Sequence, residues 1–374
     1  MKRWPDKVII GLTGNIATGK SVVRRMLEHQ GAFGIDADAL GHRALDPTSP
    51  GFNQVLEAFG TSIRDDSGHI DRKALGQIVF SDPLALKRLE AIVHPLIRQA
   101  IAVLIENAPQ KVIVIEAIKL LEGDLFALCD SIWVTEAAQE TQLARLMDKR
   151  KMRHEDALQR IRSQPPQAQK LAVADVIIHN DISFEAIWDQ VNQAWQRLFP
   201  ETQPTSPTPL PIPGMIVEYA RPERASEIAA FMTKTNLEQN NISTGQVMRE
   251  FSQKTFILLK IDDKIVGLAG WATNNLVGLV DDVHLSPKID PSQALPLLIQ
   301  ETENASRIRQ CEVNLLFIPA HYAGRAIGWE SMGYEITHLS QITVQAWVEA
   351  VHESELRDAI MFIKRLNQGQ VFCV

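Results

Sequence analysis

The sequence predicts an α/β protein in two parts, and three observations lead to this prediction. Short apolar runs alternate with longer helical patterns over the first 200 residues, which is typical of parallel strands joined by crossover helices. A proline-rich segment then separates this half from a second one with its own pattern of strands and helices. The chain of 374 residues also exceeds the length at which one hydrophobic core stops growing. We therefore expect a first domain over residues 1–200, a linker over 201–214 and a mixed α/β domain over 215–374.

Five runs supply the strands of the first domain. They are KVIIGL (7–12), AFGID (32–36), KVIVIE (111–116), SIWVT (131–135) and DVIIHN (175–180). Each is nearly continuous in apolar residues, as expected for strands that helices cover on both faces. The first domain should therefore be a five-stranded parallel sheet enclosed by helices.

The linker is recognised by its composition. The segment PETQPTSPTPLPIPG (200–214) carries a proline every two to four residues and has no periodic apolar pattern. Proline at this density favours an extended, semi-rigid spacer. Because such a linker carries few of the contacts that hold domains together, we expect a fragment ending near Leu198 to fold and to keep most of its activity.

Composition excludes several classes of protein. Apolar residues make up 45% of the chain, yet no apolar run approaches the roughly 20 residues of a membrane-spanning helix. The N-terminus has no signal-peptide pattern, so we expect a cytoplasmic protein without a membrane partner. Its cysteines, Cys129, Cys311 and Cys373, match neither a disulfide framework nor a metal site. The net charge of −7 argues against nucleic acid as the main partner and favours a small molecule.

A phosphate-binding loop is predicted directly after the first strand. The pattern Gly14-x-x-x-x-Gly19-Lys20-Ser21 follows that strand, and an apolar helical stripe begins at Val22. Glycine lets the backbone curl so that amide groups point at phosphates, to which the new helix adds its positive end. Lys20 supplies a cation and Ser21 an oxygen ligand for Mg²⁺. The stretch should therefore hold a nucleoside triphosphate with magnesium.

Two carboxylates follow the second strand. Asp36 and Asp38 come at the carboxyl end of the sheet, where open α/β proteins hold their ligands. Alternation along an extended backbone turns both side chains the same way. One of them could accept the proton of an attacking hydroxyl group, as phosphoryl transfer to a hydroxyl requires. Alternatively, either residue caps the helix that starts near Ala39, and both roles can coexist.

A cationic region follows the fourth strand. Residues 135–166 contain basic side chains in a helical pattern, namely Arg145, Lys149, Arg150, Lys151, Arg153, Arg160 and Arg162. In an acidic protein with a phosphate loop, such a cluster indicates a lid that closes over the triphosphate and neutralises the transferred phosphoryl group. The alternative is a solvated helix face.

Taken in order, these motifs resemble the dephospho-CoA kinases. The resemblance covers about residues 7–198 and rests on TGNIATGKS (13–21), IDAD (35–38), IVHPLI (92–97), QLARLM (142–147), Gln164 and ADVIIHN (174–180). It implies ATP-dependent phosphorylation of the ribose 3′-hydroxyl of dephospho-CoA, the last step of coenzyme A biosynthesis. ATP, Mg²⁺ and dephospho-CoA are the ligands that it implies.

The resemblance also assigns roles to single residues. Asp38 corresponds to the proposed base, with Lys20 and Arg145 as the other catalytic groups, and Ser21 to the metal ligand. The ATP-binding residues are Gly14, Asn15, Ile16, Ala17, Thr18, Gly19, Lys20, Ser21, Val22 and Lys149. The acceptor site is formed by Asp36, His94 and Glu116.

Some of these positions depart from the family pattern. Asn15 and Ala17 stand where many relatives have glycine, which removes some backbone freedom from the loop. Lys149 stands where relatives usually have arginine, and a lysine lacks the bidentate phosphate contact, so Arg150 is the alternative.

Two acceptor-site assignments have alternatives. Glu116 stands where a Pro-Leu-Leu strand end is expected, and it is predicted near either the magnesium or the acceptor. His94, directly before Pro95, is equally explained as a residue at a helix start.

The second half resembles the GNAT acetyltransferases in its order of strands and helices, with a hairpin turn predicted at residues 262–264. In that family a glycine-bearing loop binds the pyrophosphate of acetyl-CoA, but residues 286–292 read SPKIDPS. The two prolines remove donors, no glycine allows close approach, and Asp290 repels phosphate. We therefore expect a GNAT-like fold without a working acetyl-CoA site.

Two other functions stay open. One is a kinase for another small nucleoside or nucleotide, and the other is a regulatory protein that binds nucleotide and acts through its C-terminal half. Intact Lys20, Ser21 and Asp38 favour an enzyme, because a pure nucleotide binder has no need of a base. The oligomeric state is left open.

Overall fold

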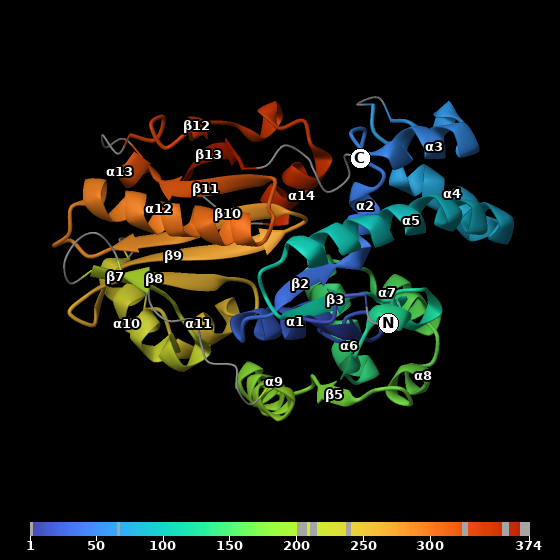
Figure 1. Cartoon of the computed structure of the whole chain (residues 1–374), viewed down its shortest axis with the longest axis horizontal. Coiled ribbons are helices and arrows are strands. Elements are labelled where there is room, and N and C mark those ends of the chain that lie inside the picture. The colour runs from blue at the N-terminus through green and yellow to red at the C-terminus, as the bar shows by residue number, and fades with distance from the viewer. Residues whose placement is uncertain are drawn as a thin grey trace.

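Two sheets, one in each half of the chain, organise the structure (Figure 1). The computed structural model describes residues 3–65, 68–199, 208–209, 215–236, 241–323, 328–353 and 359–366. In Figure 1 the N-terminal half, blue to green, lies to the right of the C-terminal half, yellow to red. The predicted linker lies outside the described residues, except for the short strand β6 (Thr208–Pro209).

Five strands form the N-terminal sheet. They are β1 (Val8–Thr13), β2 (Phe33–Asp36), β3 (Val112–Glu116), β4 (Ser131–Glu136) and β5 (Val176–His179). Their order is β2-β3-β1-β4-β5, and the paired strands are parallel. The predicted five-stranded parallel sheet is therefore confirmed.

Helices cover both faces of this sheet. α1 (Lys20–His29) and α9 (Phe184–Leu198) share an apolar cluster with Ile10 of β1 on one face. α2 (Ala37–Arg43) and α5 (Pro83–Asn107) share another with Ile9 on the opposite face. Because successive residues of β1 turn to opposite buried faces, the strand is apolar throughout.

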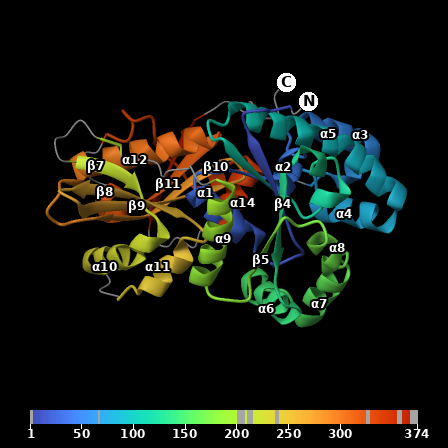
Figure 2. The same cartoon turned by 60° about the horizontal axis from the view of Figure 1, so that its bottom comes forward.

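Smaller helices complete the N-terminal half. α3 (Pro50–Phe59), η1 (Thr61–Ile63) and α4 (Arg72–Ser81) pack around a separate apolar cluster beside α5. η2 (Leu120–Glu122) and η3 (Phe126–Leu128) follow β3. The predicted lid region forms α6 (Gln139–Arg150), α7 (His154–Arg162) and α8 (Gln167–Leu171). Figure 2 shows these three helices grouped next to β5.

Helix α5 differs from the sequence interpretation of His94 as a helix start. The helix begins at Pro83, where Asp82 caps it by accepting from the N–H of Leu84 at 2.8 Å, and it continues through Pro95 to its end. A proline inside a helix removes one backbone donor. The buried residues on both sides of Pro95, among them Val93 and Ala100, hold the helix in place despite this loss.

The C-terminal half is built on a mixed sheet. Its strands are β6, β7 (Met215–Tyr219), β8 (Thr255–Ile261), β9 (Lys264–Asn274), β10 (Val277–Leu285), β11 (Val313–Pro319), β12 (Glu335–Ile336) and β13 (Ala359–Arg365). The order is β12-β13-β11-β10-β9-β8-β7-β6, with β10 and β11 parallel and the other pairs antiparallel. This arrangement confirms the predicted mixed α/β class.

Helices cover this second sheet as well. α12 (Pro291–Ile308) packs on one face, and α10 (Ala225–Thr235), α11 (Thr244–Glu250) and α14 (Gln345–Glu353) pack against two other apolar clusters of the sheet. η4 (Pro222–Arg224), α13 (Ala320–Ala323) and η5 (Leu339–Gln341) are short. The predicted hairpin turn joins β8 to β9 through Asp262 and Asp263, whose φ angles of 46° and 64° are typical of a two-residue hairpin loop.

The loop that precedes α12 carries its own anion. Oδ1 of Asp290 caps the helix by accepting from the N–H of Ser292 at 2.9 Å, and Pro291 is the first helical residue. The positive end of this helix therefore already faces a carboxylate. This geometry agrees with the expectation that the loop does not hold a pyrophosphate, which stays a prediction.

The two halves contact each other directly. Leu276, in the turn between β9 and β10, packs against the N-terminal core. Gln310 donates to the carbonyl of Leu104 at 2.9 Å, and Trp188 donates to Glu223 at 3.1 Å. These contacts come from segments outside the linker. A fragment that ends near Leu198 lacks these contacts, which the composition of the linker does not reveal.

Two further expectations concern cysteines and membranes. Cys129 is a thiol that donates to the carbonyl of Leu125 at 3.2 Å, Cys311 is buried, and Cys373 lies outside the described residues. Within the part of the chain that the structure describes, the helices are too short or too polar to cross a bilayer.

Candidate active site

The phosphate loop runs from the end of β1 to the start of α1. Its two defining glycines have positive φ angles, 153° at Gly14 and 91° at Gly19. A Cβ atom at Gly19 would lie 1.7 Å from Nδ2 of Asn180, so no other residue fits there. Ala17 also takes a left-handed conformation, with φ of 57°. The replacement of glycine at this position is therefore strained, by about 1–2 kcal/mol.

Side chains of the lid region hold the loop from one side. Oε1 of Gln164 accepts from the N–H of Ile16 at 2.8 Å, and Oε1 of Gln167 accepts from the N–H of Asn15 at 3.1 Å. Nδ2 of Asn15 donates in turn to the carbonyl of Pro165 at 3.1 Å. Ile16 also packs into an apolar cluster with α6 and α7. The sequence motif contained Gln164 but assigned it no role. Gln167 was not predicted from the sequence.

Lys20 is buried in the first turn of α1. Its Nζ donates to two carbonyl oxygens of the loop, at 3.1 and 3.2 Å. Burial lowers the pKa of Lys20, and the carboxylates of Glu116, Asp38 and Asp36 act against this shift. The ammonium group therefore lies between the loop and the carboxylates that end β2 and β3.

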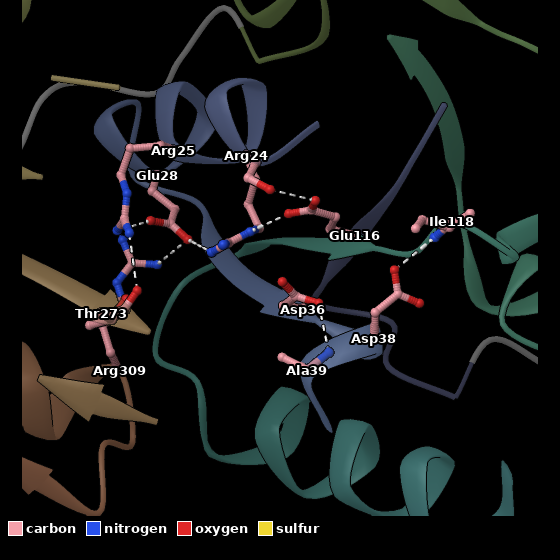
Figure 3. A network of polar contacts seen from close by, with 11 residues as sticks. Arg24, Arg25, Glu28, Asp36, Asp38, Ala39, Glu116, Ile118, Thr273 and Arg309 are labelled. Carbon is pink, nitrogen blue, oxygen red and sulfur yellow. Dashed lines mark hydrogen bonds and ion pairs between the residues drawn. The ribbon is translucent and has the colours of Figure 1, made fainter. Parts of the chain in front are cut away.

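Glu116 lies beside the predicted metal ligand. Its Oε1 accepts from the hydroxyl of Ser21 at 2.9 Å, and its Oε2 accepts from Nε of Arg24 at 2.7 Å (Figure 3). It is the last residue of β3, in register with Asp36 of β2, and is only 4% exposed. Sequence reasoning missed Arg24, although its place three residues after Ser21 puts both on one face of α1.

Asp36 and Asp38 have different local roles. β2 ends at Asp36, whose Oδ1 caps α2 by accepting from the N–H of Ala39 at 2.9 Å. Asp38 lies inside the first turn of α2, and its Oδ2 accepts from the N–H of Ile118 at 3.1 Å. The prediction of an extended backbone through Asp38 is wrong, because α2 already begins at Ala37. The capping alternative is confirmed for Asp36.

The surroundings of the Asp38 carboxyl group favour its protonated form. The residue is exposed, yet the protein atoms packed around its carboxyl raise the pKa of Asp38, and the N–H of Ile118 and the charge of Lys20 act against this. The bond to Ile118 engages Oδ2 and leaves Oδ1 for another partner. A carboxylate with a raised pKa accepts a proton more readily near neutral pH.

Arg145 joins the lid to the phosphate loop. Its guanidinium donates to the carbonyl of Ala17 at 3.0 Å and to the backbone and side-chain oxygens of Asn180 at 2.7 and 2.9 Å. Asn180 in turn donates to the carbonyl of Thr18 at 2.8 Å. The side chain of Lys149 lies outside the described part of the structure, so the choice between it and Arg150 stays open.

Comparisons with known proteins agree with this geometry. The profile of the family described as dephospho-CoA kinase matches residues 8–185. A dephospho-CoA kinase of Streptomyces avermitilis is 41% identical over 190 residues, which are 50% of this chain and 93% of that relative. One of Geobacter sulfurreducens is 40% identical over 51% of this chain and 99% of its own length. The chain belongs to the dephospho-CoA kinase family.

The second half of the chain has a different match. A solved acetyltransferase of the GNAT family from Staphylococcus aureus Mu50 is similar over 41% of this chain and 99% of its own length, with 10% identity and a TM-score of 0.33. The match to dephospho-CoA kinases covers residues 8–185, so we call the N-terminal half the kinase half from here on.

Two further residues of the kinase half bear on the sequence prediction of the site. His94 is exposed on α5, and its contact with the acceptor stays a prediction. Lys170 of α8 was missed, although it is 3% exposed and donates to the carbonyl of Ile118 at 2.9 Å. Burial, followed by the charge of Lys20, lowers the pKa of Lys170. Ile118 is thus held through its carbonyl by Lys170 and through its N–H by Asp38.

The oxygen ligands and positive groups around the phosphate loop suit a nucleotide that is bound together with Mg²⁺. The hydroxyl of Ser21 and the carboxylate of Glu116 are hard oxygen donors in direct contact. Mg²⁺ typically binds one or two protein oxygens together with phosphate oxygens and water. The loop amides and Lys20 provide the positive surroundings that those phosphates need.

Proposed function

We propose that the chain transfers the γ-phosphoryl group of ATP to the ribose 3′-hydroxyl of dephospho-CoA, giving CoA and ADP in the last step of coenzyme A biosynthesis. One observation carries this proposal: Lys20 contacts the phosphate loop and lies near both Asp38 and Glu116, and Glu116 accepts from the hydroxyl of Ser21. A binding module has no need of the base.

The loop and Lys20 would hold the triphosphate. The ammonium of Lys20 now donates to two loop carbonyls, and a bound phosphate would offer it stronger, charged acceptors. Ser21 is the protein ligand for Mg²⁺, with Glu116 next to it. Magnesium would supply charge neutralisation between the β- and γ-phosphates.

Asp38 would activate the acceptor. Its free Oδ1 takes the proton of the 3′-hydroxyl while that oxygen forms a bond to the γ-phosphorus. The bond from the γ-phosphorus to the bridging oxygen breaks, and ADP leaves with the electron pair. Asp36 supports this step from a distance, because it fixes the start of the helix that carries Asp38.

Arg145 would act on the other side of the loop. Its guanidinium lies between Ala17 and Asn180, close to where the loop turns around the phosphates. The basic lid helices α6 and α7 carry more positive charge, which closure would bring to the transferred group. This closure is part of the proposal.

A coupled assay of ADP release tests the proposed reaction. The full chain with MgATP should release ADP when dephospho-CoA is added, and far less with AMP, uridine or shikimate. Equal turnover with a simple nucleoside would contradict the assignment and favour the alternative of another small-molecule kinase. Tight ATP binding without turnover of any acceptor would favour the regulatory alternative.

The C-terminal half is proposed to have no acetyltransferase activity, because Asp290 and two prolines occupy the loop before α12. A robust transfer from acetyl-CoA to a panel of amines would contradict this. A cytoplasmic location and a small-molecule partner, without nucleic acid or membrane, complete the proposal.

A further inference from the structure

Buried ion pairs connect the C-terminal half to the phosphate-loop helix (Figure 3). Glu28 of α1 is at their centre and is 7% exposed. Its Oε1 accepts from Arg24 at 2.8 Å, its Oε2 accepts from Arg25 at 2.7 Å, and Arg309 of the C-terminal half lies 3.9 Å from Oε1. Burial by itself raises the pKa of Glu28, but Arg25, Arg309 and Arg24 outweigh it and bring this pKa to about 2.

The C-terminal half supplies the outer contacts of this network. The carbonyl of Thr273, in β9, accepts from Arg25 at 3.1 Å. Arg309 donates to the carbonyl of Ala32 at 2.9 Å, and its guanidinium lies over the ring of Phe33, 5.7 Å from the centroid. Ala32 and Phe33 lead into β2, the strand that ends at the acceptor side of the site. Two separate parts of the kinase half are therefore held by residues of the C-terminal half.

Arg24 carries the network to the phosphate loop. It shares its guanidinium between Glu28 and Glu116, and Glu116 accepts from the hydroxyl of Ser21. Burial acts to lower the pKa of Arg24, but the carboxylates of Glu28 and Glu116 outweigh it and raise this pKa. The position of Glu116 beside Ser21 thus depends on how Arg24 is held, and Arg24 is held by Glu28.

Loss of one partner is costly for this network, and Arg24 is a side chain with space to move. A buried ionic group that loses a partner stays desolvated without compensation. The backbone of Gly34 approaches Glu28 so closely that a Cβ there would lie 2.0 Å from Oε1. A cavity of about 60 Å³ between the halves, lined by Arg24, Asn274 and Arg309 among others, offers space into which Arg24 can move once its partner is released.

We propose that the C-terminal half is a positioning element of the kinase site, in which Arg309 and the carbonyl of Thr273 hold α1 and, through Glu28 and Arg24, keep Glu116 in place beside Ser21. This inference deepens the proposed function and rests on it for the turnover measurements alone. If a variant leaves only a fraction of molecules in the competent arrangement, its apparent affinity for MgATP falls by that fraction. Bound MgATP then restores the arrangement, so kcat changes little.

The substitution Arg309→Gln in the full chain tests this proposal. It removes one charge from the network at a residue that does not touch the phosphate loop. We expect the dissociation constant and the KM for MgATP to rise roughly tenfold, with kcat within about twofold of the native value. We also expect the amides of α1 to exchange hydrogen faster in the nucleotide-free protein, as measured by mass spectrometry. Arg309→Lys keeps the positive charge but lacks the planar guanidinium group. Its MgATP affinity and its exchange of α1 should lie between those of the native protein and those of Arg309→Gln.

The control is another ion pair between the halves. Arg72 and Glu349 lie 3.1 Å apart, each about one-third exposed, and have no part in the network. Glu349→Gln should leave MgATP affinity and the exchange of α1 unchanged. If Arg309→Gln and Glu349→Gln behave alike, or if Arg309→Gln keeps native MgATP affinity and native exchange of α1, the proposal is wrong.

A second variant serves if Arg309→Gln does not fold. Arg25→Lys keeps a cation near Glu28 but loses the geometry that reaches Thr273. It should weaken MgATP binding several-fold and speed exchange of α1, and native values for both would overturn the proposal. The measurements of MgATP binding and of hydrogen exchange in α1 need no phosphoryl acceptor. A chain that failed to phosphorylate dephospho-CoA would therefore refute the proposed function and still give a decisive answer here.

Discussion

Arg145 and Asn180 form a clasp over the phosphate loop: the guanidinium donates to both oxygens of Asn180, and Asn180 itself donates to the loop. The two residues lie far apart in sequence, one on α6 of the lid and one directly after β5. These contacts join the lid to the loop through protein atoms alone.

Arg145→Lys should open this clasp. A lysine cannot reach the carbonyl of Ala17 and both oxygens of Asn180 at once, because it lacks the planar fork of donors. We expect turnover to fall by about 10² or more if the guanidinium also stabilises the transferred phosphoryl group. Steady-state kinetics with saturating MgATP measure this, and native turnover in the lysine variant would remove Arg145 from the catalytic groups.

Lys20→Ala should impair both ATP binding and transfer. The substitution removes a buried cation that would contact the triphosphate before and during the reaction. The dissociation constant for MgATP should rise while kcat falls. Calorimetry and steady-state kinetics on the same preparation separate the two effects. A change in kcat with unaltered ATP affinity would contradict the predicted role in binding.

Asp38→Asn should separate binding from chemistry. The phosphate loop is untouched, so MgATP affinity should stay near the native value. Turnover with dephospho-CoA should fall by about 10² to 10⁴, the usual effect of removing a general base. The measurement is kcat for the asparagine variant beside the native enzyme at saturating substrates.

Asp36→Asn is the matched control for this prediction. Asparagine caps a helix about as well as aspartate does, so the bond to Ala39 should survive and activity should fall less than in Asp38→Asn. If Asp36→Asn or Glu116→Gln abolishes turnover while Asp38→Asn keeps it, the base has been misassigned.

Much of the kinase half could be predicted from the sequence because its signals are local. Each buried parallel strand is a continuous apolar run, and the loop motif places Lys20 and Ser21 by spacing alone. The direction of Asp38 could not be predicted, since it depends on α2 starting at Ala37, one residue after the strand ends. Propensity does not fix an element boundary to that precision.

The partners of the site residues were harder to predict because they are remote in sequence. Gln167 binds Asn15 across 152 positions, and Arg25 binds Thr273 across 248. No spacing rule links such pairs, and a buried arginine on α1 looks like any other basic helix residue. The contacts between the halves were missed for the same reason, since the linker is visible in the sequence and the interface is not.

We expect His29 to make the interface between the halves sensitive to pH. Its Nε2–H donates to the carbonyl of Phe251 at 2.8 Å, and burial lowers the pKa of His29 to about 4 despite that bond. The unfolded state therefore takes up a proton near pH 6.5, before the folded state does. The contribution of neutral His29 to the free energy of unfolding is fully present above this pH. It is lost as the pH drops from about 6.5 toward 4.

The loss between pH 7 and pH 5 should be about 2 kcal/mol in the free energy of unfolding, since 1.5 pKa units are involved. Urea denaturation at both pH values, followed by Trp188 fluorescence near the interface, measures it. His29→Gln keeps a donor for Phe251 and cannot be protonated, so its stability should change less over this range. Equal losses in both proteins would assign the pH dependence to groups other than His29.

Removal of the C-terminal half should weaken the kinase, contrary to what the linker alone suggests. A chain ending at Leu198 lacks the Thr273 carbonyl that accepts from Arg25, and it lacks Arg309, the third cation near Glu28. It also exposes the part of the N-terminal core that Leu276 covers. We expect a lower unfolding temperature and a KM for MgATP raised about tenfold or more.

The matched control is the full chain with a protease site placed in residues 201–214 and then cleaved. Cleavage leaves the interface in place, so the nicked protein should keep native affinity for MgATP while the truncated one does not. If both lose affinity alike, the linker and not the interface joins the halves; if neither does, the kinase half is self-sufficient.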